Sequence, residues 1–87
     1  MFSRSKAKLE TDRAQRPATG FREATLLLTG RVSLDTANRA CRALESLRSG
    51  SESHVTAQIE RGVRVYFRYP GEQIPAAEIE AAASKAL

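Results

Sequence analysis

Three residues in the second half of the chain, Arg64, Tyr66 and Arg68, have the types and the spacing most able to do chemistry. They alternate with apolar residues, and successive side chains of a strand point to opposite faces, so all three would share one face. Two cations around an aromatic ring suit contact with a protein surface. The ring could also stack on a nucleic acid base while the cations contact its phosphates, but Tyr66 is the only aromatic residue available there.

Catalytic chemistry finds little support in the sequence. The only histidine, His54, lies in an alternating segment that points it outward, with no partner close in sequence. Glu78 and Glu80 are two residues apart in an expected helix and therefore point to different sides. The sequence contains no glycine-rich phosphate loop, zinc-ligand spacing or nucleophile motif. We therefore expect a protein that is not an enzyme and holds no cofactor.

The net charge of +4 is confined to the start of the chain. Residues 1–22 contain six Lys or Arg against two carboxylates, whereas residues 23–87 contain eight of each. The segment 1–22 shows no helical or strand period and ends in a breaker cluster around Pro17 and Gly20. We expect it to be a disordered basic tail that attracts phosphate or acidic surfaces, and residues 23–87 to form the folded domain.

The segment 23–87 predicts the order β-α-β-β-α. Apolar residues alternate in the expected strands and recur at spacings of three and four in the expected helices. Ser33 and Pro75 are residue types that begin helices, and Arg61-Gly62 suits a hairpin turn. The predicted elements are a strand at 24–29, a helix at 34–48, strands at 54–60 and 63–69, and a helix at 76–87.

A set of apolar, glycine and glutamate positions across residues 24–87 forms a family pattern. The positions are Leu26-x-Leu28-x-Gly30, Ala40-x-x-Ala43-Leu44, Val55-x-Ala57-x-Ile59, Gly62, Val63-x-Val65-x-Phe67 and Glu78-Ile79-x-x-Ala82. The pattern resembles the heavy-metal-associated domain of copper chaperones and metal-transporting ATPases. This resemblance implies an α+β, ferredoxin-like open-faced sandwich, with two helices covering one face of an antiparallel sheet.

The resemblance also implies where a metal would bind. The two cysteines of the family's Cys-x-x-Cys motif fall here at Ser33 and Thr36. Hydroxyl groups are neutral and hard, so they cannot replace the thiolates that monovalent copper requires. Cys41, the only cysteine, lies more than a turn further on the apolar stripe, where we expect a buried core thiol. We expect no metal site of the family's kind, and a metal carrier with atypical ligands stays an alternative.

A second departure from the family concerns the sheet. The family has a fourth strand after its second helix, and this chain ends at Leu87, where that strand would begin. Without it, the strand containing Thr25, Leu27 and Thr29 would be a bare edge, whose free backbone groups invite another strand. A second copy, a partner protein or the N-terminal tail could supply that strand.

Together these features predict a non-enzymatic protein-interaction or regulatory module that self-associates or captures a strand at this edge. The predicted contact residues are Thr25, Leu27, Thr29, Arg64, Tyr66 and Arg68. The alternative function is a nucleic-acid-binding domain that uses the basic tail and the open sheet face. The chain has neither a secretory signal nor an apolar run of the ~20 residues that a membrane span needs, so we expect a cytoplasmic protein without membrane association.

Overall fold

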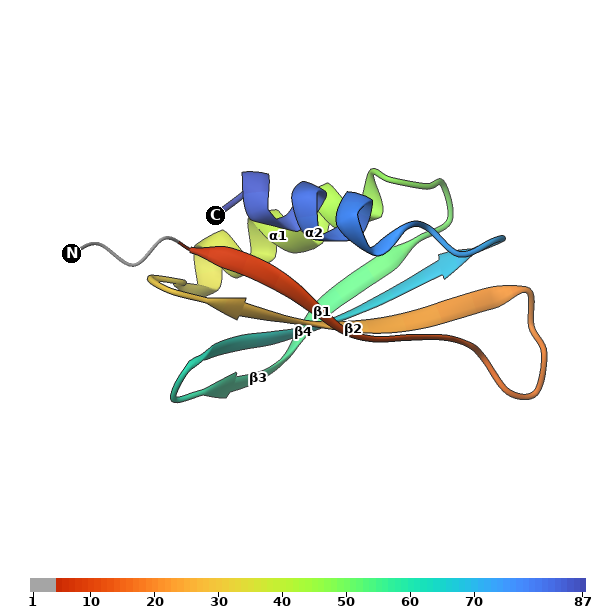
Figure 1. Ribbon diagram of the computed structural model, residues 1–87, viewed down its shortest axis with the longest axis horizontal. Helices are drawn as coiled ribbons and strands as arrows, with labels where there is room; N and C mark the ends of the chain where they lie inside the picture. Colours follow the sequence, from red (N-terminus) through yellow and green to blue (C-terminus); the bar gives the residue numbers. More distant parts are fainter. Residues whose placement is uncertain (1–4) are drawn as a thin grey trace.

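The computed structural model describes residues 5–87 and shows one four-stranded sheet with both helices on the same side of it (Figure 1). The elements in chain order are β1 (Lys6–Ala14), β2 (Phe21–Thr29), α1 (Leu34–Glu45), β3 (Glu52–Ile59), β4 (Gly62–Pro70) and α2 (Ala76–Lys85). Neighbouring strands are antiparallel throughout, in the order β1-β2-β4-β3. Neither helix of the described part combines the length and hydrophobicity needed to cross a membrane.

The expected ferredoxin-like β-α-β-β-α fold with a missing fourth strand is wrong. The order of elements is β-β-α-β-β-α, and β1 pairs with β2 from Lys6 opposite Thr29 to Ala14 opposite Arg22. The same finding corrects the expectation of a disordered N-terminal tail, because residues 6–14 form β1. Residues 1–4 of that expected tail lie outside the described residues.

β1 forms although it brings only two apolar side chains to the core. Ala7 is 7% exposed, and Leu9 is half-buried against the same cluster. Lys6 and Lys8 alternate with them and stay exposed, which is the strand period. The register then shifts between Leu9 and Thr11, so the alternation lasts only four residues before a β-bulge interrupts it. Because most of the surrounding residues are charged, this four-residue alternation does not identify a strand in the sequence.

The hydrophobic core lies between the sheet and the two helices. The alternating apolar residues of β2 and β4 point into it, and α1 adds the stripe that its spacing predicts. The largest fully buried side chains are Tyr69, Phe67, Leu26, Leu28, Leu44, Ile74, Ile79 and Val65. Cys41 is also in this core, as predicted, and burial raises the pKa of its thiol. A one-residue slip of β4 would expose this whole apolar set, so burial fixes the register.

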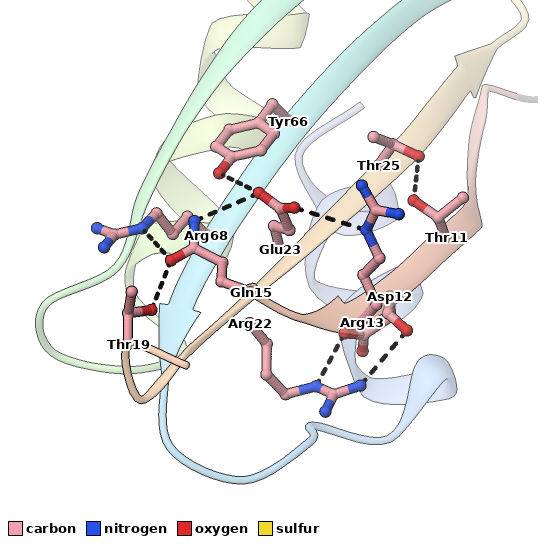
Figure 2. Close-up of polar contacts among 10 residues, drawn as sticks. All are labelled: Thr11, Asp12, Arg13, Gln15, Thr19, Arg22, Glu23, Thr25, Tyr66 and Arg68. Carbon is pink, nitrogen blue, oxygen red and sulfur yellow. Dashed lines mark hydrogen bonds and ion pairs between the residues drawn. The ribbon is translucent and has the colours of Figure 1, made fainter. Parts of the chain in front are cut away.

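A polar cluster closes one end of this core. The Asp12 carboxylate accepts hydrogen bonds from Arg22 Nε at 3.0 Å and from Tyr69 Oη at 2.7 Å. The Tyr69 hydroxyl in turn accepts from the backbone N–H of Ile74 at 3.2 Å. The Asp12 side chain is only 4% exposed. This cluster therefore joins β1, β2, β4 and the segment that leads into α2; Figure 2 shows its Asp12–Arg22 part.

Candidate functional site

The strand edge predicted as a contact site is occupied within the chain. Thr25, Leu27 and Thr29 lie in β2, which pairs with β4 on one side and with β1 on the other. The bare edge expected there is absent, because the N-terminal segment supplies the missing strand. A strand from another molecule therefore cannot add at β2 while β1 stays in place.

The two outer strands of the sheet are protected by the helices. In β1, the N–H groups of Ala7 and Leu9 donate to side chains of α2, to Ser84 Oγ at 3.0 Å and Glu80 Oε2 at 2.8 Å. In β3, the N–H of Ser53 donates to Glu45 Oε2 of α1 at 2.9 Å. Each outer strand also carries a bulge, which interrupts the flat edge that a new strand would need. Edge pairing is therefore disfavoured on both sides.

Replacing Glu80 by alanine should lower the free energy of unfolding by about 1.5 kcal/mol, because the partly buried Leu9 N–H loses a charged acceptor. Chemical denaturation measures the loss, and hydrogen exchange should show faster exchange at the Leu9 amide. Glu78→Ala is the matched control, since Glu78 lies on the exposed side of the same helix. Equal losses in the two variants would show that the contact with β1 contributes nothing.

The face of the sheet turned away from the helices, called the open face below, brings the two predicted groups of contact residues together. In the register of β2 and β4, Thr25 lies opposite Tyr66 and Leu27 opposite Arg64. Arg68 lies further along β4 on the same face, opposite Glu23. The prediction that the β4 stripe shares one face is confirmed.

In β3, two apolar side chains do not face the helices as the alternation of the sequence predicts. Strict alternation placed Ala57 and Ile59 toward the helices together with Val55. A bulge at Thr56 shifts the register, so Ala57 lies opposite Arg64 on the open face. Ile59 is consequently 39% exposed. An extra residue in a strand reverses the faces of all that follow it.

The two arginines predicted as contact residues on the open face, Arg64 and Arg68, are paired with carboxylates, whereas Lys6 and Lys8 of β1 lie exposed on the same face. Arg64 Nε lies 2.8 Å from Glu10 Oε1, and this partner raises the pKa of Arg64. Arg68 Nη1 lies 3.4 Å from Glu52 Oε1. The sequence did not single out either carboxylate, because both are far from their partners along the chain and meet them only through strand pairing.

Glu23 is the centre of the polar contacts around Tyr66 and Arg68 on this face (Figure 2). Its Oε2 accepts from Tyr66 Oη at 3.1 Å and from Gln15 Nε2 at 3.3 Å. Hydrogen bonds from Gln15 and then Tyr66 lower the pKa of Glu23. Gln15 Oε1 also accepts from Thr19 Oγ1 at 2.7 Å and from Arg68 Nε at 3.3 Å. The contacts therefore hold the Glu23 carboxylate ionised and in a fixed position.

Two shallow hollows, of about 390 and 360 Å³, adjoin Glu23 and share Arg13 in their walls. A carboxylate with a lowered pKa is a weak base, and burial raises the pKa of the neighbouring Tyr66 hydroxyl. Both shifts disfavour proton transfer near neutral pH.

Ser33 and Thr36, the two positions where the resemblance would place metal ligands, form a helix cap. Thr36 N donates to Ser33 Oγ at 3.2 Å, and Ser33 N donates to Thr36 Oγ1 at 2.9 Å. This reciprocal capping box begins α1 and uses both hydroxyls. Within residues 5–87, no three His, Cys, Asp or Glu side chains come close enough to hold a metal ion together.

Comparison of the chain with protein-family models, with curated proteins and with solved structures found no match. The comparisons therefore do not bear on the resemblance to the heavy-metal-associated domain.

Proposed function

We propose that this protein is a non-enzymatic interaction module that binds another protein through the open face of its sheet. The observation that carries the proposal is the prearranged polar lattice of that face, in which Tyr66 and Arg68 are held by Glu23, Gln15 and Glu52. Side chains already fixed before binding lose less entropy in a complex. Tyrosine and arginine are also the residues most enriched at the energetic centres of protein interfaces.

The size and composition of the face fit this role. Four strands about 4.8 Å apart, each with about nine residues at about 3.4 Å, give a face of roughly 19 by 30 Å. Such a face, of about 570 Å², lies below the roughly 800 Å² that each partner contributes to a standard interface and fits a small, transient one. Half-buried Phe21, Leu27 and Tyr66 supply apolar surface at separate points of the face, between charged side chains, and tyrosine is enriched at protein interfaces.

Pairing of the cations favours a protein partner over the nucleic acid alternative. Phosphate binding depends on cations that can neutralise phosphates and release counterions. Arg64 and Arg68 each contact a carboxylate, which leaves Lys6 and Lys8 of β1 as the exposed cations beside them on this face. A cytoplasmic location belongs to the same proposal, because Cys41 is a lone thiol and disulfides are rare in that compartment.

Replacing Leu27 by glutamate should reduce partner binding at least tenfold, because it replaces the apolar contact surface between Lys8 and Arg64 with a charge. The measurement is photo-crosslinking in the source cells, followed by reconstitution of the captured protein with purified wild type and variant. Leu34→Glu is the matched control: Leu34 is 48% exposed at the start of α1, on the helix side of the sheet. The control should bind like the wild type.

Light scattering of the purified chain distinguishes the kinds of protein partner. A wild-type dimer that Leu27→Glu converts to a monomer would identify a second copy as the partner. Equal binding by wild type and Leu27→Glu would contradict the proposal. Saturable binding of labelled single-stranded RNA or DNA, with an affinity that falls steeply with salt, would replace it with the nucleic acid alternative.

A further inference from the structure

The hollow of about 360 Å³ on the open face has a fixed anion in its wall. Glu23 lines it together with Thr11, Arg13, Ala24, Thr25 and Tyr66. The two groups that donate to Glu23 Oε2, the Tyr66 hydroxyl and the Gln15 amide, are both neutral. They fix the carboxylate without cancelling its charge, so the site favours a cation.

The cation that now meets Glu23 is loosely held. Arg13 Nε lies 3.5 Å from Glu23 Oε1, farther than the closest atoms of the other three ion pairs of residues 5–87. The Arg13 side chain is 79% exposed, whereas that of Glu23 is 27% exposed. Exposed pairs of this kind contribute little to stability, because solvent competes for both charges. Arg13 can therefore leave while the carboxylate stays in place.

Arg68 and Lys8 do not take the place of Arg13, and Arg16 lines the neighbouring hollow but forms no ion pair with Glu23 within residues 5–87. Arg68 lies opposite Glu23 on β4, but its guanidinium stacks 3.7 Å over the Phe21 ring and its Nη1 meets Glu52. Figure 2 shows Arg13 and Arg68 on opposite sides of Glu23. Lys8 lies opposite Leu27, four residues from Glu23 along β2, or about 14 Å. That separation exceeds the Debye length of about 8 Å at physiological ionic strength.

We propose that Glu23 receives an arginine side chain of the partner protein, which displaces Arg13 and lies against the Tyr66 ring. This inference rests on the proposed function and names the side chain that the open face recognises. A guanidinium fits better than an ammonium, since it is planar, donates two parallel hydrogen bonds and stacks on rings. The stacking of Arg68 on Phe21 shows that this face already accommodates a guanidinium against an aromatic ring.

The test is an NMR titration of the full chain with a capped Gly-Arg-Gly peptide. Saturable shifts at Glu23 and Tyr66 are expected, with weaker binding of Gly-Lys-Gly and none of Gly-Glu-Gly. Arg13→Gln should raise the affinity for the arginine peptide about two- to fivefold, because the internal competitor is gone. Glu23→Gln keeps an oxygen acceptor for the Tyr66 hydroxyl but removes the charge, and should abolish saturable binding.

Three outcomes would overturn the inference: equal binding of the arginine peptide by wild type and Glu23→Gln, no gain in Arg13→Gln, or preference for the glutamate peptide. The Leu27→Glu experiment separates this failure from failure of the proposed function. If partner binding depends on Leu27 but not on Glu23, the open face is the docking surface and the arginine pocket is wrong. If the peptide binds at Glu23 but Leu27→Glu binds the partner like the wild type, the proposed docking surface is wrong and the arginine pocket is supported.

Discussion

Replacing Asp12 by alanine is expected to lower the free energy of unfolding by about 3 kcal/mol. The carboxylate is almost fully buried and is the partner of both the Arg22 guanidinium and the Tyr69 hydroxyl. Without it, a buried hydroxyl keeps no acceptor and a cation keeps no counterion. Arg22 is 20% exposed and can partly reach water, so the loss should fall at the low end for a broken buried pair.

The measurement for Asp12→Ala is urea denaturation, with Glu52→Ala as the matched control. The Glu52→Ala variant also breaks an ion pair with an arginine. However, the Glu52 side chain is 63% exposed and its contact with Arg68 is 3.4 Å long. The control should cost at most about 0.5 kcal/mol. A double-mutant cycle with Tyr69→Phe should give a coupling energy of about 1 kcal/mol between the two side chains. Equal losses for Asp12→Ala and Glu52→Ala would show that burial does not strengthen the cluster.

The same cluster determines how stability responds to alkaline pH. Burial first, and the hydrogen bond to Asp12 second, raise the pKa of Tyr69. A folded-state pKa above the unfolded value of about 10 means that the protonated form is favoured in the native state. This contribution is complete below the unfolded pKa and is lost as pH rises through the folded pKa. In Asp12→Ala the tyrosinate absorbance should therefore rise at lower pH than in the wild type.

Most of the elements could be predicted from the sequence because each has a long apolar period. The strands β2 and β4 and the helices α1 and α2 bury their alternating or helically spaced side chains where expected, as Leu26 and Val65 show. β1 could not be found in this way. It buries Ala7 and Leu9 alone before its bulge, and its stability comes from pairing with β2 and from the side chains of α2. These are tertiary contacts, which a local pattern does not contain.

The candidate site was predictable to the same degree. Alternation along one strand was enough to place Tyr66 and Arg68 on a common face. The groups that hold them are Glu23 and Gln15, which lie in β2 and just after β1, more than forty residues away. Their roles depend on which strands are neighbours in the sheet, and the sequence did not reveal β1, the strand that places Gln15 beside β2. The bulge at Thr56 had no sequence signal that we recognised.

Replacing Gly62 by alanine is the second change expected to have a large effect, a loss of about 3 kcal/mol in the free energy of unfolding. Gly62 begins β4 opposite Thr29. A Cβ there would lie 1.9 Å from the carbonyl oxygen of Leu28 and 2.9 Å from its carbon. These are backbone atoms of the central strand pair, so they cannot move aside as a flexible side chain would. The two strands must separate locally or shift.

Gly20→Ala is the control that isolates this crowding. Gly20 has φ of +83°, which disfavours a side chain, but nothing lies within 4 Å of the position of its Cβ. Its substitution should cost only about 1 kcal/mol, the price of a left-handed conformation without Gly. Hydrogen exchange at Leu28 and Val63 should accelerate in Gly62→Ala and not in Gly20→Ala. If the two variants lose the same stability, the close approach of β4 to Leu28 is not what requires a glycine, and the β3–β4 turn absorbs the added methyl group.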